Sequence, residues 1–291
     1  MNWILFALLF SITQATFSIV AVDPETGEVG SAGASCIAGS IIISEIHPGV
    51  GAIHTQSYWN YTNQNNASDL MDDNYSPEEI IDYLIHNDSQ NNPAIRQYGV
   101  VDMVDGGRSD AFTGSGCFDY KNHILGDTYA IQGNILIGQE VLDNMEYNFL
   151  NTDGPLENRL MSALQGANLP GADERCLEYS TSSLSAFIRL AKPTDTDEFF
   201  LDLNVNSVSN GVEPIDVLQE LYDEWIIYSI EFTFGDINYD NMIDILDVVS
   251  IVNIVLSSEE TPIETFLPAD LNEDEIINIQ DIIILVNIIL N

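Results

Sequence analysis

Residues 16–35 read TFSIVAVDPETGEVGSAGAS, and this stretch predicts how the fold begins. Two runs that start with β-branched and other strand-forming residues, 16–23 and 28–35, flank the sequence PETG. A proline- and glycine-containing insert between two such runs is typical of a β-hairpin. The second run consists mostly of small residues, which indicates that neighbouring backbone approaches it closely.

The fifteen residues before this hairpin, MNWILFALLFSITQA, have the layout of a secretory signal peptide. A short apolar run is followed by Thr13 and Ala15 at the −3 and −1 positions of a cleavage site, and the run is shorter than the ~20 apolar residues of a transmembrane helix. Cleavage after Ala15 makes Thr16 the new amino terminus. An N-terminal threonine can act as a nucleophile, because its own α-amine can serve as the base for its hydroxyl. The alternative is that Thr16 follows a signal peptide without any chemical role.

The composition restricts the partners. The chain has 46 acidic and 7 basic residues, a formal net charge of −39, so we expect no nucleic-acid partner and no binding to anionic membranes. The apolar stretch 282–290 is too short to span a bilayer, so no membrane insertion is expected. A hydrophobic content of 45% favours a folded protein over a disordered one. The signal peptide predicts that this protein is secreted, and so extracellular or associated with the cell surface. In an oxidising exterior two of the three cysteines can pair, and the sequence leaves open which of Cys36, Cys117 and Cys176 stays free.

The region from Thr16 to residue 232 indicates an α+β domain. Strand patterns recur at residues 49–55, 98–104, 110–113 and 183–189. Ser76, Pro77 and two glutamates open a helix that continues through Ile85, and further helices are predicted at 138–150 and 155–164. A last helix, 214–225, carries Leu218, Leu221, Tyr222 and Trp225 on one face. Strands on either side of helices favour a layered domain over residues 16–232, followed by a second domain over 233–291.

The second domain contains one pattern twice. Two segments, which begin at Asp236 and Asp270, place Asp or Asn at positions 1, 3, 5 and 12 of a loop, and each loop precedes an apolar helix. Ca²⁺ takes 6–8 oxygen ligands, with a backbone carbonyl at position 7. The predicted ligands are Asp236, Asn238, Asp240, Met242 and Asp247 in the first loop, and Asp270, Asn272, Asp274, Ile276 and Asp281 in the second. Position 6, where glycine is usual, is Asn241 in the first loop and Glu275 in the second. Asparagine tolerates the left-handed turn at this position better than glutamate does, so the second site should be weaker.

This twin pattern resembles type I dockerin modules. The resemblance implies a small all-α, EF-hand-like domain with two calcium sites and antiparallel helices. It also implies docking to a cohesin-like scaffold or surface protein, often in a polysaccharide-degrading assembly. No organic cofactor is expected. An alternative is that the two apolar helices pack against a second copy of the chain.

The first domain resembles the domain-of-unknown-function family 1028, which has the N-terminal-nucleophile (Ntn) hydrolase fold of proteasome subunits. The stretches that carry the resemblance are TFSIVAVDPETGEVGSAGAS, GVGAIHTQSY, RQYGVVD, TGSGC, YAIQGNIL, PLENRLMSAL and GADERC. The resemblance implies a four-layer αββα sandwich with Thr16 at the start of a central strand. Thr16 is then the catalytic residue. Polar residues in or near the matching stretches are candidates for the substrate pocket or oxyanion site: Ser35, Gln56, Arg96, Asn134, Asp173, Arg175 and Ser183.

One feature departs from the proteasome pattern, in which a lysine near the nucleophile lowers the pKa of its amine. The only lysines here are Lys121 and Lys192, and neither lies in the corresponding stretch 42–47. Two functions therefore remain: a secreted amidohydrolase acting on a small amide or peptide, tethered by a calcium-loaded dockerin, or a non-catalytic binding or accessory module in the same kind of assembly. No carboxylate pair indicates a glycosidase.

Overall fold

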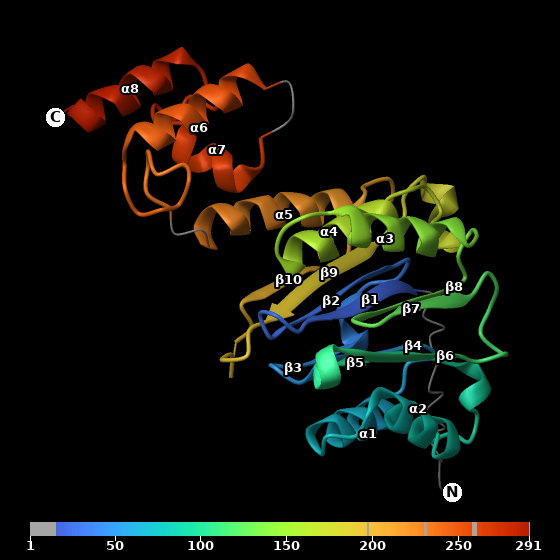
Figure 1. Ribbon diagram of the computed structural model, residues 1–291. Coiled ribbons are helices and arrows are strands. Elements are labelled where there is room, and N and C mark those ends of the chain that lie inside the picture. Colours follow the sequence, from blue (N-terminus) through green and yellow to red (C-terminus); the bar gives the residue numbers. More distant parts are fainter. Residues whose placement is uncertain (1–15, 197, 230–231, 258–260, 291) are drawn as a thin grey trace, which may run out of the picture. The chain divides into compact units, whose positions relative to one another are not determined.

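The computed structural model describes residues 16–196, 198–229, 232–257 and 261–290, and Figure 1 labels its helices and strands. The predicted signal peptide, residues 1–15, lies outside the described residues. The chain divides into two compact units between Gln219 and Glu220, within helix α5 (Pro214–Ser229). Within the described residues, no helix combines the length and the apolar character needed to cross a membrane.

Two antiparallel sheets form the centre of the first unit. The larger sheet has six strands in the order β10-β9-β2-β1-β8-β7 and the smaller has four in the order β3-β4-β5-β6. The strands of the larger sheet are β1 (Thr16–Asp23), β2 (Glu28–Ser35), β7 (Asn122–Gly126), β8 (Tyr129–Asn134), β9 (Ser185–Ala191) and β10 (Leu201–Val205). Those of the smaller sheet are β3 (Ser44–His47), β4 (Gly51–Ser57), β5 (Arg96–Asp102) and β6 (Arg108–Thr113).

Helices cover the outer face of each sheet, as Figure 1 shows. Helices α3 (Glu140–Asn151) and α4 (Leu156–Gly166) lie on the larger sheet, and α1 (Tyr61–Asp72) and α2 (Pro77–His86) lie on the smaller one. Strand β1 contacts β4 and β5 across the interface between the sheets. This arrangement confirms the predicted four-layer αββα sandwich.

The local sequence explains the β1–β2 hairpin, the close approach of α4 to it and the start of α2. The predicted hairpin pairs β1 with β2, and Val22 faces Val29 next to the turn. A Cβ atom at Gly30 would lie 2.3 Å from the Leu160 Cδ1 atom, so glycine allows α4 to approach the sheet. Helix α2 begins with a capping box between Ser76 and Glu79, as its sequence indicates.

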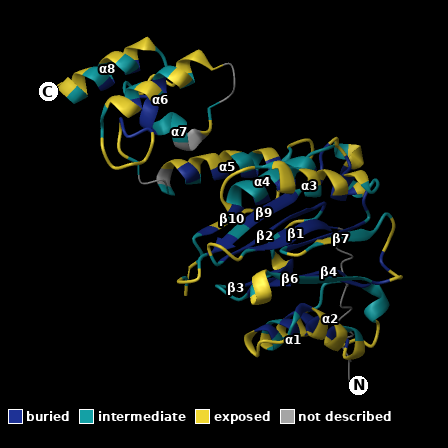
Figure 2. Cartoon of the chain, viewed as in Figure 1, coloured by how far each residue is buried: buried dark blue, intermediate teal, exposed yellow. Residues whose placement is uncertain are grey.

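Apolar side chains fill the interfaces between the layers. Figure 2 shows that buried residues concentrate in the two sheets. One cluster lies between the sheets and includes Val20, Val29, Val101 and Ala130. Another joins the smaller sheet to its helices: Ile53, Ala67, Met71, Ile80, Ile81, Leu84, Tyr98 and Val100.

The second unit contains three further helices, α6 (Ile245–Leu256), α7 (Ile263–Ala269) and α8 (Ile279–Leu290). Its buried core includes Ile251 of α6 and Leu285 of α8, which occupy equivalent positions in the two copies of the repeat. The fold class predicted for this region, a small all-α domain, is therefore confirmed. The short helix α7 between the two repeats was not predicted.

Candidate functional site

Thr16 is the first residue of β1, a central strand of the larger sheet. Its side chain is buried, and its hydroxyl Oγ1 has no hydrogen-bond partner within the described structure. An unpartnered buried hydroxyl costs free energy that a core residue ordinarily avoids. Thr16 is thus a nucleophile candidate with a hydroxyl that no neighbouring group uses.

The hydroxyl of Thr16 faces the smaller sheet. Thr16 and Asn134 are cross-strand partners, and such partners project from the same face of a sheet. Asn134 donates a hydrogen bond from Nδ2 to Gln97 Oε1 of the smaller sheet at 3.0 Å. Ser18, the next residue along β1 on the same face, donates to Gln56 Oε1 at 2.7 Å.

Gln56 and Gln97 form the opposite wall of the site. They are cross-strand partners on β4 and β5, and Gln56 Nε2 donates to Gln97 Oε1 at 2.8 Å. Gln56 Nε2 also donates to the carbonyl oxygen of Thr16 at 3.3 Å. The structure therefore brings Gln56 and Asn134 together with Thr16, and all three side chains are buried.

A deeper polar layer continues between the sheets from Ser18. His54 Nδ1 lies 2.9 Å from Ser18 Oγ, and Nε2 lies 2.6 Å from Ser31 Oγ. Burial, with a smaller electrostatic contribution from Arg189, lowers the pKa of His54 to about 3. His54 is therefore a neutral, fully buried residue with both ring nitrogens hydrogen-bonded, and it packs in the core away from solvent.

Ser35, Asp173 and Ser183 lie at the same end of the larger sheet. The register that pairs Phe17 with Ala34 brings Ser35, at the end of β2, beside the start of β1. Asp173 Oδ2 accepts a hydrogen bond from the backbone N–H of Cys36 at 2.7 Å, and Asp173 bridges to Leu136 just beyond Asn134. Ser183 is buried just before β9, and its hydroxyl lies 3.1 Å from that of Ser182.

Arg175 belongs to the same end of the sheet through Asp173. Its Nη2 and Nε atoms donate to the two oxygens of that carboxylate at 2.8 and 3.0 Å. The carboxylate is fully buried, whereas 29% of the Arg175 side chain is exposed. A disulfide between Cys36 and Cys176 ties this segment to β2, and Cys117 stays free and buried.

Arg96 is not part of this cluster, contrary to its selection as a pocket candidate. Side chains alternate along a strand, so Arg96 points to the helix side of the sheet while its neighbour Gln97 points to the interface between the sheets. Arg96 forms a buried ion pair with Asp88, with Nε and Oδ2 2.7 Å apart, and also donates to the carbonyl of Tyr58.

Neither lysine stands in for the proteasome lysine. Lys121 pairs with Asp119, and the ammonium of Lys192 lies 3.3 Å from the centre of the Phe200 ring. Gln97, which hydrogen-bonds to both Gln56 and Asn134, is not among the site residues predicted from the sequence. Its only signal in the sequence is an amide side chain next to an apolar strand pattern, RQYGVVD. The structure shows that every residue of this strand is buried.

The two predicted calcium loops have the same hydrogen-bond pattern. Asp247 Oδ1 accepts from the N–H groups of Ile237 and Asn238, and Asp281 Oδ1 accepts from those of Leu271 and Asn272. Asp236 Oδ2 accepts from Asn241 N at 2.9 Å, and Asp270 Oδ2 accepts from Glu275 N at the same distance. The two loops are therefore structural repeats.

The residues of both loops fit a hard cation. Asp236, Asp247, Asp270 and Asp281 are all buried, and every ion pair found in the described residues lies outside the second unit. Buried carboxylates of this kind need a compensating positive charge. In the described residues, no group of three or more His, Cys, Asp or Glu side chains converges closely enough to hold a metal ion by those side chains alone. Calcium ligation would also use the amide oxygens and backbone carbonyls of the loops.

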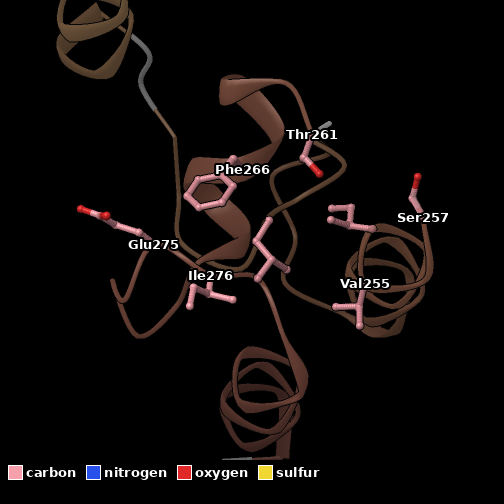
Figure 3. A pocket seen from close by; sticks show the side chains of 8 residues that line it. Val255, Ser257, Thr261, Phe266, Glu275 and Ile276 are labelled. Atoms are coloured by element: carbon pink, nitrogen blue, oxygen red, sulfur yellow. The ribbon is translucent and has the colours of Figure 1, made fainter. Parts of the chain in front are cut away.

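A pocket in the second unit borders the second loop. Figure 3 shows side chains around it from the end of α6 (Val255), from α7 (Phe266) and from the loop (Glu275 and Ile276). The carbonyl oxygen of Ile276, a predicted calcium ligand, accepts a hydrogen bond from Asn278 Nδ2 at 3.1 Å.

Comparison with protein families identifies the class of the chain. Residues 16–215 match the family described as "Family of unknown function (DUF1028)", and the chain belongs to this family. Residues 234–290 match the dockerin type I domain. No curated protein matches the chain.

Solved structures include a relative from the same family. A crystal structure of a protein from Silicibacter pomeroyi, assigned to DUF1028, is similar with a TM-score of 0.60 and 26% sequence identity, over 73% of this chain and 89% of that one. Two Anbu (ancestral β-subunit) proteins, from Yersinia bercovieri and Hyphomicrobium sp. strain MC1, are also similar, each with a TM-score of 0.39 and 13% identity. They cover 73% and 74% of this chain, and 95% and 98% of their own chains.

The chain is therefore a DUF1028 domain followed by a dockerin module. Type I dockerin domains bind calcium and cohesins and occur in extracellular or cell-surface complexes. The second unit is therefore a dockerin module, of a class that binds calcium and attaches to a scaffold.

Proposed function

We propose that the chain is a secreted Ntn-type amidohydrolase, attached to a cohesin-like scaffold by its calcium-loaded dockerin. The observation that carries the proposal is the Thr16 hydroxyl, which is buried and unpartnered at the start of a central strand beside Gln56 and Asn134. Membership of the DUF1028 family supports the αββα fold that this reaction would require.

The reaction begins when cleavage after Ala15 frees the α-amine of Thr16. Thr16 Oγ1 attacks the carbonyl carbon of an amide, and the amine takes the hydroxyl proton directly or through water. The C–N bond then breaks, the leaving amine takes the proton, and an ester to Thr16 remains for water to hydrolyse. The side-chain amides of Gln56 and Asn134, which lie beside Thr16, are the proposed donors to the developing oxyanion. The proposed lining of the substrate approach is the group of polar residues at this end of the sheet, Ser35, Asp173, Arg175 and Ser183.

Intact mass of the exported protein, with and without a β-lactone probe, tests this proposal. We expect a mature chain that starts at Thr16 and gains one adduct, and we expect Thr16→Ala to lose the adduct and all amide turnover. Thr55→Ala is the matched control. Thr55 is also buried with an unpartnered hydroxyl, but its cross-strand partner is Tyr98, which contacts the helix layer. A mature chain with a different start, or one without an adduct, would overturn the proposal in favour of a non-catalytic binding module.

The dockerin would hold two Ca²⁺ ions, the second more weakly. Glu275 adopts a left-handed backbone, with φ of 64°, and so does Asn241, with φ of 66°. This conformation costs glutamate more than asparagine. Calorimetric titration of the calcium-free chain checks this. Two binding events are expected, and Asp281→Ala should remove the weaker one and Asp247→Ala the tighter one.

A further inference from the structure

We propose that Gln97 is a positioning residue of the Thr16 site, whose single side-chain amide fixes both Gln56 and Asn134 beside the nucleophile. This inference rests on the proposed function of Thr16. It assigns a role to a residue that, in the described residues, hydrogen-bonds to Gln56 and Asn134 and not to Thr16 itself.

Two cross-strand pairs face each other across the interface between the sheets. Thr16 and Asn134 form one pair, and Gln56 and Gln97 form the other. The Oε1 atom of Gln97 accepts a hydrogen bond from Gln56 Nε2 at 2.8 Å and a second from Asn134 Nδ2 at 3.0 Å. One oxygen atom therefore sets the orientation of both amides.

The other end of the Gln97 amide fixes which way it points. Its Nε2 donates toward the carbonyl oxygens of Gly133 and Asn122, at 2.8 and 3.1 Å, and toward Thr113 Oγ1 at 2.9 Å. Exchanging the oxygen and the NH₂ group of this amide would place its oxygen against two carbonyl oxygens and its NH₂ against two other NH₂ groups. Only the observed orientation satisfies the hydrogen-bonding groups around it.

The position of Gln56 depends on this arrangement. Gln56 Nε2 reaches the Thr16 carbonyl as well as Gln97, and its Oε1 accepts from Ser18. Without the Gln97 oxygen, both Gln56 and Asn134 lose an acceptor and gain freedom to rotate. Catalysis depends on donors held in place before the reaction, because donors that must reorient in the transition state stabilise it less.

The experiment compares the rate at which the β-lactone labels Thr16 in three variants. Gln97→Met removes the amide with little change in volume, and Gln132→Met is the matched control. Gln132 is likewise a fully buried strand glutamine between the sheets, but its hydrogen bonds in the described residues go to Ser18 and His54 and not to Gln56 or Asn134. Ser18 can still donate to Gln56 when the Gln132 amide is removed. We expect Gln97→Met to label roughly 10–100-fold more slowly than the unmodified sequence, and Gln132→Met to keep its rate within about two-fold although it loses comparable thermal stability.

Gln97→Glu adds a readout that a purely structural role would not move. A protonated carboxyl, like an amide, has one donor and one acceptor end, whereas a carboxylate places charge against the Gly133 and Asn122 carbonyls. The labelling rate of Gln97→Glu, divided by that of the unmodified sequence at each pH, should therefore rise as the pH falls. Equal labelling in Gln97→Met, equal slowing in Gln132→Met, or a ratio independent of pH would each overturn the role of Gln97. An unmodified chain that does not label at all would instead overturn the proposed function, and the role of Gln97 with it.

Discussion

The ion pair of Arg96 and Asp88 is almost completely removed from water. The side chains are 2% and 1% exposed, and Asp88 also accepts hydrogen bonds from Asn63 and from the backbone of Gln90 and Asn92. Burial raises the pKa of Asp88, but the hydrogen bonds from Arg96, Asn92 and Asn63 outweigh it and lower the pKa to about 2. The pair thus anchors β5 to the loop that follows α2.

Replacement of this carboxylate should destabilise the first unit in a pH-dependent way. Asp88→Asn leaves the Arg96 charge buried without an ionised partner, so we expect a loss of about 3–5 kcal/mol in the free energy of unfolding at pH 7. A lowered folded pKa contributes stability that is complete above the unfolded pKa, near 4, and is lost as the pH falls through about 2. The difference between Asp88→Asn and the unmodified chain, measured by urea unfolding, should therefore shrink over this window. A difference that is constant from pH 7 to pH 2 would contradict this account.

The residues at position 6 of the two calcium loops, Asn241 and Glu275, differ in the free energy that a left-handed backbone conformation costs them. Glu275→Gly removes a left-handed glutamate, so the second site should bind Ca²⁺ more tightly by roughly 1 kcal/mol, about five-fold. Asn241→Gly is the control, and its gain should be only a few tenths of that, since asparagine tolerates the conformation. Calcium titration by calorimetry measures both. Equal gains at the two loops would show that the residue type at this position does not set the difference.

Site residues could be predicted where they belong to a stretch that resembles a known family. They could not be predicted where their place in the site depends on which face of a strand they occupy. Thr16, Gln56 and Asn134 came from stretches with a family resemblance, and they do lie together. Arg96 and Gln97 are adjacent in the sequence, and the strand sends one to each face. The sequence alone did not say which face meets the other sheet, so the arginine was selected and the glutamine was missed.

At the scale of elements, helices with strong local signals were predicted and those without them were not. The capping box and apolar spacing of α2 marked it clearly. Helix α1 reads YTNQNNASDLMD, and the residues it buries include Asn63 and Gln64, which bond to Asp88 and Glu45. A helix that buries amides in this way shows no apolar stripe. The short strands β3, β7 and β10 also lack a signal, because their pairing depends on partners distant in sequence.

The disulfide fastens one element to the site. It joins the end of β2 at Cys36 to the 3₁₀ segment η4 (Glu174–Tyr179), which holds Arg175 and follows Asp173. Replacing both cysteines by serine should lower the free energy of unfolding by about 2–5 kcal/mol. It should also release Asp173, which bonds to the Cys36 backbone, and so slow β-lactone labelling of Thr16. Cys117→Ser, at the buried free cysteine, is the control for the loss of a buried sulfur. Labelling unchanged in the double variant would show that the disulfide stabilises the fold without supporting the site.

At the scale of the whole molecule, the formal net charge of −39 predicts that the stability of the chain depends on salt concentration. This general dependence has to be distinguished from the effect of bound calcium. Salt screens repulsion across both units over about 10 Å at 0.1 M. A bound cation acts only on the loops that supply its ligands, and each predicted calcium loop contains two buried carboxylates. In the second unit these are Asp236, Asp247, Asp270 and Asp281, whose charges no basic side chain in the described residues offsets. Salt should therefore affect the stability of both units, whereas calcium should affect only the second unit.

Hydrogen exchange on the intact chain distinguishes the two effects. Removal of calcium with a chelator at constant ionic strength should abolish protection in α6 and α8, because loss of the ion leaves the buried carboxylates to repel one another and metal binding is coupled to folding. Protection in β1, β5 and α2 should stay unchanged, since those elements belong to the other compact unit, which contains no predicted calcium ligand. Adding potassium chloride to the chelated chain should not restore α6 and α8, whereas adding calcium should. Recovery with potassium chloride alone would mean that the loops respond to screening and hold no specific ion.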